Sequence, residues 1–311
     1  MLPAVSRVGF MVAACLGGGA AQPVERSTIP HDCVNDNLPY QLITTIDAFE
    51  LHSWDWATGE RSVHWKLQQA NHPNVTRVNA CGIDPEDNIA YCIVYRNGGY
   101  LGRLDKNGIA YVARTPGGEF SVSASFDENG TFWATTRDEI WKLKAPHNLK
   151  GWSEPSADLP KLRVVGNTSM NHGADIVAWQ DHIVSVRGSK VILTDLSDKN
   201  LETWEAKPSL ADPMEGGFGG AYLYSGSLYF SANGGKGVYR IEPDLKLRTF
   251  IGTRVGASFD TNNNDGLNCI FTESPDEVGR IKDAGFHTSM LGASIVILSL
   301  LGHLMNSVGA P

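Results

Sequence analysis

The stretch that decides the fold is residues 79–114, which read NACGIDPEDNIAYCIVYRNGGYLGRLDKNGIAYVAR. It contains four short apolar runs, and a polar or glycine-containing turn separates each run from the next. Short runs of β-branched and aromatic residues between such turns are typical of strands joined by hairpins. The stretch therefore predicts a meander of four antiparallel strands.

The same unit recurs three more times along the chain. The spacing between equivalent turns is about 43, 53 and 45 residues, and the long interval contains an insertion at residues 146–160. Four strands in about 40 to 45 residues is the length of a propeller blade. The equivalent turns lie at Asp84, Asp127, Gln180 and Ser225.

The two ends of the repeat region complement each other. Residues 256–260 resemble a first strand with no blade behind it, whereas residues 40–47, 51–56 and 61–67 resemble three strands that lack a first one. Pairing the two ends would remove both open sheet edges. The expected fold is all-β: a five-bladed β-propeller in which N- and C-terminal strands share one blade, followed by a C-terminal apolar helix.

Residues 1–21 have the features of a signal peptide, with one cation at Arg7, an apolar run at 8–16 and small residues at 19–21. A transmembrane anchor is the alternative, but the run is too short and too rich in glycine to span a bilayer. Loss of Arg7 would change the formal net charge from −8 to about −9. No lysine- or arginine-rich run is present, so a nucleic-acid partner is not expected.

The cysteines indicate an oxidising compartment, because an even number remains once Cys15 leaves with the leader. Composition alone allows three pairings. Within the repeat, Cys81 and Cys92 are equally distant from a hairpin centre and can pair across adjacent strands. Cys33 and Cys269 would then close the ring, with a stabilisation of roughly 4 to 5 kcal/mol. Three N-glycosylation sequons, at Asn74, Asn129 and Asn167, also favour export.

Several of these motifs resemble a known family. Residues 81–91, 219–229 and 238–243 and the ending NNDGLNC at 263–269 are similar to an uncharacterised family of secreted propeller-like domains, catalogued as a domain of unknown function. The likeness covers about residues 40–270, and the ending is its most specific part. The third unit departs from the pattern, because the turn after Trp179 lacks Asp-Gly. The resemblance implies fold and export but no activity.

In a propeller, the loops that lead from an outer strand to the next inner strand gather at one mouth of the channel. Residues at these positions mix carboxylate, imidazole and guanidinium groups, as a polar ligand or an acid–base pair requires. Ordinary solvated loop residues are the alternative interpretation. The ligand-binding candidates are Arg77, Glu119, Asn171, His172, Glu215 and Arg254.

Two functions are compatible with these residues. The first is a secreted or cell-surface module that binds a polar ligand such as a glycan or a protein. The alternative is an extracellular, glycosidase-like hydrolase that uses Glu119 and Glu215, because glycosidic cleavage uses two carboxyl groups about 5 to 9.5 Å apart. The sequence has no nucleophile elbow, phosphate loop, zinc motif or dinucleotide fingerprint, which counts against the common enzyme classes.

Residues 260–266 offer oxygen ligands at alternating positions, as calcium loops do. They miss the EF-hand pattern, because the glycine comes one position late and no glutamate occupies the twelfth position. A polar turn is the alternative, and no other cofactor is expected. The weak calcium candidates are Asp260, Asn262, Asn264 and Asp265.

The chain becomes apolar at residues 290–310 and is long enough there to span a membrane. Small residues at 283–285 and the absence of basic residues after the run resemble a glycosylphosphatidylinositol signal. A retained transmembrane helix and a helix packed on the propeller are the alternatives. The expected organisation is signal peptide 1–21, lead-in 22–39, propeller 40–273, linker 274–289 and membrane anchor or anchor signal 290–311, in an extracellular or cell-surface protein.

Overall fold

The computed structural model describes residues 24–117, 123–168, 170–209, 214, 216–258, 260–261 and 264–276. Within these residues the regular structure is almost entirely β-strand, which confirms the all-β class. The predicted signal peptide and apolar tail lie outside the described residues. In the part of the chain that the structure describes, no helix is long and apolar enough to cross a membrane.

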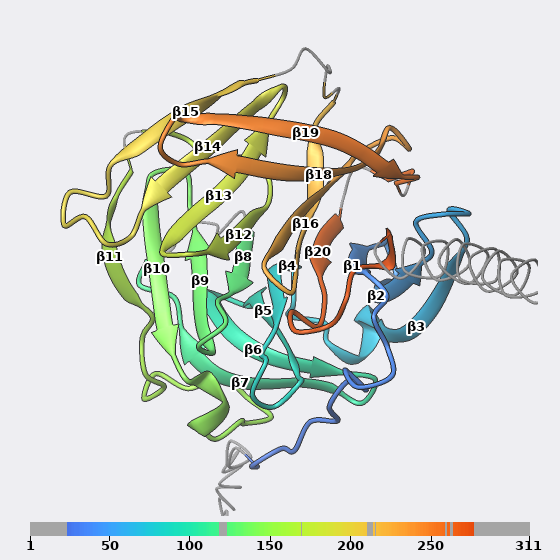
Figure 1. The fold of residues 1–311 in the computed structure, drawn as a ribbon. Helices are drawn as coiled ribbons and strands as arrows, with labels where there is room; N and C mark the ends of the chain where they lie inside the picture. Colours follow the sequence, from blue (N-terminus) through green and yellow to red (C-terminus); the bar gives the residue numbers. More distant parts are fainter. Residues whose placement is uncertain are drawn as a thin grey trace, which may run out of the picture.

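Each predicted repeat forms an antiparallel meander of four strands (Figure 1). The first two meanders contain β4 (Arg77–Ile83), β5 (Ala90–Tyr95), β6 (Gly99–Asp105), β7 (Gly108–Arg114), β8 (Ser123–Phe126), β9 (Thr131–Thr135), β10 (Glu139–Lys144) and β11 (Arg163–Asn167). The next two contain β12 (Ile176–Trp179), β13 (His182–Arg187), β14 (Lys190–Asp195), β15 (Thr203–Pro208), β16 (Phe218–Tyr224), β17 (Ser227–Ala232), β18 (Gly237–Asp244) and β19 (Thr249–Gly256).

The two ends of the described chain share one sheet, as predicted. Its order is β20 (Asn264–Leu267), β1 (Tyr40–Thr44), β2 (Ala48–Trp54) and β3 (Arg61–Gln68), and we call it the closing sheet. The prediction of its first strand at 256–260 was wrong, because Gly256 is the last residue of β19 and pairs there with Val238 of β18. The strand is β20, in which Gly266 approaches β16 so closely that an added Cβ would lie 2.5 Å from the Ala221 amide nitrogen.

The first strands of the sheets lie near the centre of the molecule, and β3, β7, β11, β15 and β19 lie at its periphery (Figure 1). β4 contacts β8, β8 contacts β12, β12 contacts β16, β16 contacts β20, and β20 contacts β4. A short parallel pairing of β15 with β19 joins two meanders into an eight-stranded sheet. The arrangement is propeller-like.

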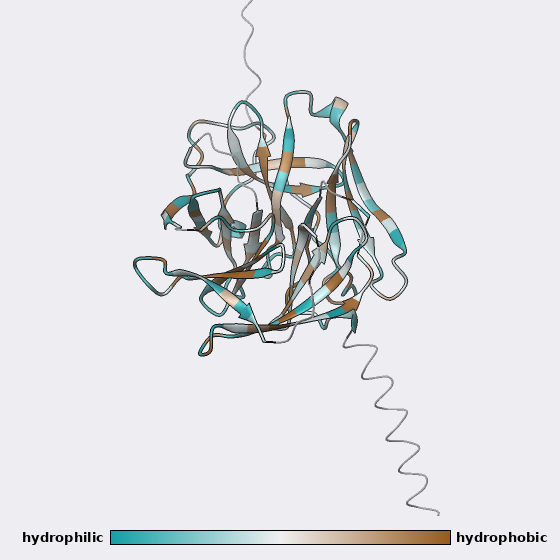
Figure 2. Cartoon of the chain, turned by 90° about the horizontal axis from the view of Figure 1, so that it is seen from above, coloured by the Kyte–Doolittle hydropathy of each residue, from teal (hydrophilic) through white to brown (hydrophobic). Residues whose placement is uncertain are grey.

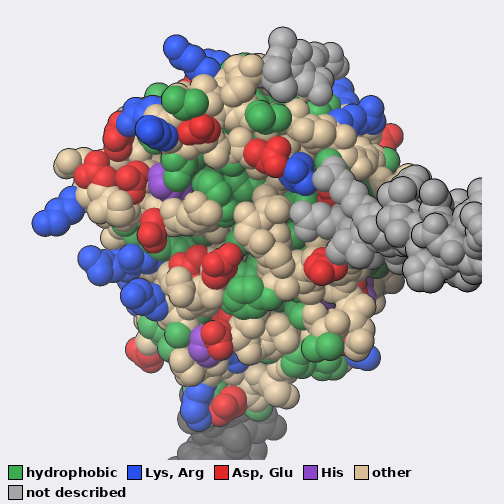
Figure 3. Space-filling view, viewed as in Figure 1, with side chains coloured by type: hydrophobic (Ala, Val, Ile, Leu, Met, Phe, Trp, Pro, Cys, Tyr) green, Lys and Arg blue, Asp and Glu red, His purple; other side chains and the backbone are tan. Residues whose placement is uncertain are grey.

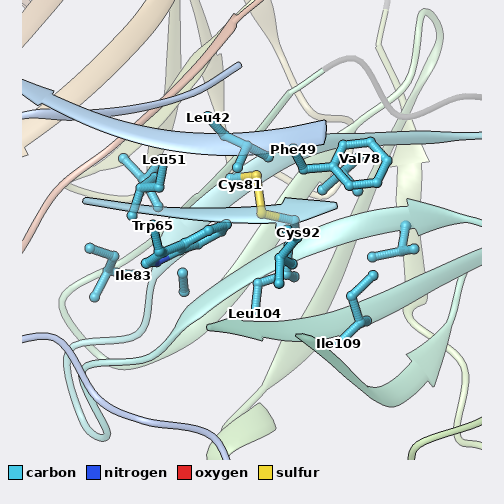
Figure 4. Packing of buried hydrophobic residues seen from close by; sticks show 14 of the residues in the cluster. Leu42, Phe49, Leu51, Trp65, Val78, Cys81, Ile83, Cys92, Leu104 and Ile109 are labelled. Atoms are coloured by element: carbon cyan, nitrogen blue, oxygen red, sulfur yellow. A yellow bond between two sulfur atoms is a disulfide. The ribbon is translucent and has the colours of Figure 1, made fainter. Parts of the chain in front are cut away.

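The core lies between the sheets. Hydrophobic and hydrophilic residues follow one another along the strands (Figure 2), so each sheet can pack a face against its neighbours. The strand tryptophans mostly serve this packing: Trp54, Trp56, Trp133 and Trp141 are buried, whereas Trp179 is half-buried. Figure 4 shows the cluster between the closing sheet and β4–β7, including Leu42, Phe49 and Leu104.

Both predicted disulfides are present. Cys81 and Cys92 face each other across β4 and β5, within the core cluster of Figure 4. Cys33 and Cys269 join the two ends of the described chain across 236 residues. Two disulfides indicate an oxidising, extracellular environment.

The insertion between β10 and β11 packs on the outer edge of β7. The Tyr111 and Trp152 backbones exchange two hydrogen bonds, and the Arg103 guanidinium donates to the carbonyl oxygens of Pro146 (3.1 Å), His147 (3.0 Å) and Leu149 (2.8 Å). The insertion and β7 enclose a cleft of about 470 Å³. Its walls include Val112, Leu149, Trp152, Leu159 and Pro160.

Arg103→Met is expected to lower the free energy of unfolding by about 2 kcal/mol, because three carbonyl oxygens lose a charged donor. Urea unfolding measures this loss. Arg240→Met is the control, since Arg240 forms an exposed ion pair with Glu242 and should cost less than about 1 kcal/mol. Equal losses in the two variants would show that Arg103 does not hold the insertion.

Candidate functional site

A buried pair of carboxyl groups lies where the first strands meet. Asp175 immediately precedes β12, and Asp265 lies on β20. Their exposed fractions are 3% and 2%. The Gly266 amide donates to Asp175 Oδ2 over 3.2 Å, and the two carboxyl groups lie within hydrogen-bonding reach of each other. A contact 90 residues apart in sequence thus connects the β12–β15 meander to the closing sheet.

Burial raises the pKa of Asp175 well above its ordinary value, and the charge of Asp265 raises it further. Burial also raises the pKa of Asp265 to about 7, although its hydrogen bonds with Asp175 and with the Ala80 and Cys81 amides, and the charge of Arg77, act in the opposite direction. Asp265 Oδ2 has no hydrogen-bond donor among the described residues. The pair therefore retains a shared proton near neutral pH.

The structure places four of the predicted mouth residues in different surroundings. Arg77 begins β4, is half-buried, and acts electrostatically on Asp265. Asn171 is exposed, and its carbonyl oxygen accepts a 3.4 Å bond from Arg187. Arg254 is exposed on β19, where its guanidinium lies over Gly237.

His172 is buried and hydrogen-bonded at both ring nitrogens. Nδ1 lies 3.1 Å from Ser185 Oγ, and Nε2 lies 3.0 Å from Thr194 Oγ1. Burial lowers the pKa of His172 to about 4, so the ring is neutral at physiological pH. In this position His172 connects β13 with β14.

Glu119, Glu215 and Asn262 lie outside the described residues, and Asn264 is described only through its backbone. The remaining two calcium candidates are separated, because Asp260 is exposed beside Gly235 whereas Asp265 is buried against β4. Among the described residues, no group of three or more His, Cys, Asp and Glu side chains is arranged to hold a metal ion.

Sequence reasoning missed Asp175. Its position was informative, because it directly precedes a first strand and so belongs to the same class of positions as the mouth candidates. The sequence pattern of the third repeat predicts a strand from Ala174 to Trp179, which would place Asp175 inside that strand. Only the contact with Gly266 and Asp265 distinguishes it from an ordinary strand-end aspartate.

A second polar site lies at the opposite end of the first strands, where the turns β8–β9 and β12–β13 come together. We call it the tryptophan groove, and its volume is about 200 Å³. Gln180 and Asp181 form the second turn with φ of 45° and 59°, a left-handed pair typical of a two-residue hairpin. The groove is lined by Asp127, Glu128, Asn129, Trp133, Ala178, Trp179, Gln180, Asp181, His182 and Leu196.

Two of the lining side chains, those of Asp127 and Trp133, are held by hydrogen bonds within the β8–β9 hairpin. Asp127 Oδ1 accepts from the amides of Asn129 (2.9 Å) and Thr131 (2.8 Å), and Asp127 Oδ2 accepts from Trp133 Nε1 (2.9 Å). The Lys142 ammonium lies 4.8 Å from the centre of the Trp133 ring. Asp127 and Trp133 thus form a rigid wall rather than free binding groups.

Other lining groups face the solvent. Trp179 is half-buried and is held by a 2.9 Å bond from Nε1 to the Gly226 carbonyl oxygen. His182 Nδ1 donates to the Gln180 carbonyl oxygen over 2.7 Å. The carboxylates of Glu128 and Asp181 are exposed. An aromatic surface therefore stands beside several hydrogen-bond acceptors.

Comparison with known proteins assigns no family to this chain. No family model matches the chain, and no curated protein matches it. Similar solved structures include a candidate 6-phosphogluconolactonase from Bacteroides uniformis (15% identity, 75% of this chain and 74% of that chain, TM-score 0.36). Another is a protein from Lactobacillus plantarum (13% identity, 72% of this chain and 67% of that chain, TM-score 0.35). At these values neither likeness assigns an activity to this chain.

Proposed function

We propose that this chain is an exported five-bladed propeller that binds a glycan at the tryptophan groove. Two observations support the architecture: four meanders and the closing sheet each contribute one first strand, and these strands contact one another in a closed order. Export is supported by the two disulfides. Attachment to a membrane through residues 290–311 is part of the proposal.

The observation that carries the ligand class is the pairing of the Trp179 indole with exposed polar groups in one groove. A sugar ring has an apolar face of C–H groups and a rim of hydroxyl donors. The indole matches the face, and the carboxylates of Glu128 and Asp181 accept hydrogen bonds from the rim. The volume is below the range of about 300 to 1,000 Å³ of drug-sized pockets, which suits one sugar ring at a time.

The negative charge of the groove further limits the class of sugars that it would bind. Three carboxylates line it, namely those of Asp127, Glu128 and Asp181, and none of its described lining residues is a lysine or an arginine. Because like charges repel, acidic sugars should bind more weakly than neutral or amino sugars. Elsewhere the face shown in Figure 3 mixes side chains of both signs.

A hydrolase is less well supported. The predicted pair Glu119 and Glu215 lies outside the described residues, and Asp175 and Asp265 are both almost fully buried. The cavity that adjoins Gly266 in the channel has room of about 10 Å³, which is enough for about one water molecule. This cavity is too small to hold a sugar ring.

Trp179→Ala is expected to weaken glycan binding at least about tenfold, which corresponds to about 1.4 kcal/mol. A glycan array with neutral, amino and acidic sugars identifies the ligand, and calorimetric titration measures its Kd. Trp152→Ala is the matched control, because Trp152 is also half-buried but lies in the cleft beside β7. Unchanged affinity in Trp179→Ala, or equal losses in both variants, would contradict the assignment of the groove.

A further inference from the structure

One of the three sequons lies in the tryptophan groove. Asn74, Asn129 and Asn167 are all exposed, so each can carry a glycan without displacing the core. Asn74 lies between β3 and β4, and Asn167 ends β11. Asn129 is the sequon residue that lines the groove, together with Trp133 and Trp179.

The position of Asn129 is rigidly defined. Its backbone amide donates to Asp127 Oδ1, and the same carboxylate accepts the Trp133 indole through its other oxygen. The next residue, Gly130, completes the turn with φ of +68°. A sugar attached to the Asn129 amide nitrogen therefore starts at the edge of the groove, in a fixed relation to the indoles.

We infer that an N-linked glycan on Asn129 occupies the tryptophan groove, so that modification of this residue switches off binding of free ligand. The inference rests on the proposed function. In the modification, the Asn129 amide nitrogen displaces the lipid diphosphate from C1 of a lipid-diphosphate-linked oligosaccharide, and the nitrogen loses one proton. The first sugar, N-acetylglucosamine, is neutral and so belongs to the class that the groove favours.

Tethering makes this occupancy effective. A group held by a short flexible link has an effective concentration in the millimolar range, and it competes with free ligand without any added contact. A shallow groove that takes one sugar ring offers few contacts with which free ligand could outcompete it. The glycan on Asn129 should therefore exclude free sugars, whereas glycans on Asn74 and Asn167 should not.

The fold also determines when the modification occurs. Thr131, the third sequon residue, is 5% exposed. Its carbonyl oxygen accepts from the Asp127 amide, and its own amide donates to Asp127 Oδ1. An enzyme that must contact this threonine cannot reach it once the β8–β9 turn has formed. The modification is consequently made before folding, and each molecule keeps its state thereafter.

The first experiment measures the glycan itself. The full chain is secreted from a glycosylating host, site occupancy is measured by peptide mass spectrometry, and removal by an endoglycosidase is followed at each site under native conditions. We expect occupancy at Asn129 and removal at least tenfold slower there than at Asn74 and Asn167, with the difference abolished in Trp179→Ala. An unmodified Asn129, or equal removal rates at the three sites, would overturn the inference.

The second experiment measures free ligand, with tri-N-acetylglucosamine as the probe and tryptophan fluorescence as the signal. Asn129→Gln should bind the probe at least tenfold more tightly than the wild-type protein, whereas Asn74→Gln and Asn167→Gln should match the wild type. Equal binding by wild type and Asn129→Gln, with Asn129 occupied, overturns the inference and leaves the proposed function intact. Slow glycan removal at Asn129 without probe binding by Asn129→Gln supports the docked glycan and counts against the proposed function.

Discussion

Replacing Cys33 and Cys269 together by alanine is expected to lower the free energy of unfolding by about 5 kcal/mol. The bond closes a loop of 236 residues, so its loss restores a large amount of conformational entropy to the unfolded chain. It also connects the lead-in to the residues that follow β20, next to the sheet shared by both ends. Urea unfolding under non-reducing conditions measures the change.

The control is the double alanine variant of Cys81 and Cys92. That bond closes a loop of only 11 residues between adjacent strands, and the same entropy relation gives about 3 kcal/mol. The difference between the two variants is therefore the informative quantity. A smaller loss for the Cys33 and Cys269 variant than for the control would show that pairing of β20 with β1 closes the fold without the long-range bond.

Asp175→Asn is expected to reduce a steep dependence of stability on pH. In the unfolded chain both aspartates ionise near pH 4. In the folded protein the pKa of Asp265 is raised to about 7 and that of Asp175 is raised well above its ordinary value. The folded state therefore binds more protons between pH 4 and pH 7, and the wild-type protein loses stability as pH rises through this window.

The loss amounts to about 1.4 kcal/mol per pH unit for each group that stays protonated, so Asp265 alone, with its pKa raised from about 4 to about 7, contributes about 4 kcal/mol over three units. An asparagine at position 175 keeps the shape and donates an N–H to Asp265 in place of the shared proton. Because burial still raises the pKa of Asp265, we expect the variant to keep part of the slope, to be close to wild type at pH 4 and to be more stable than wild type at pH 8. Urea unfolding at several pH values tests this.

Asp158→Asn is the control for this pH series, because Asp158 is exposed in the insertion. It should follow the wild-type profile within about 0.5 kcal/mol at every pH. A wild-type stability that is flat between pH 4 and pH 8 would contradict a proton shared by the buried pair. Parallel slopes in wild type and Asp175→Asn would assign the pH dependence to other groups.

Much of the fold was predictable because its signals are local. Alternation along each run and the turn residues between runs located the strands of all four repeats, and β5 was predicted at 89–95 and observed at Ala90–Tyr95. The hairpin symmetry around residues 86–87 also predicted the Cys81–Cys92 bond. The exception was the first strand of the closing sheet, where residues 256–260 carried a strand-like pattern but the eight-residue β19 already used Gly256.

The candidate sites were less predictable because they depend on distant contacts. The repeat predicted which residues precede the first strands. It did not reveal that the His172 side chain is buried and hydrogen-bonded to Ser185 and Thr194. The tryptophan groove was missed for a similar reason. Trp133 and Trp179 belong to different meanders, and their common groove arises only when β8 and β12 pack side by side.

The sequence by itself thus determined the all-β class, the repeated four-stranded unit and the cysteine pairing, since these follow from side-chain alternation and from spacing within or between repeats. Only the tertiary structure decided which strand closes the ring, that Asp175 meets Asp265, and that Asn129 stands beside Trp179. The physical reason is that burial and charge depend on neighbours from other sheets. Those neighbours are separated by tens of residues along the chain, and no local pattern encodes their approach.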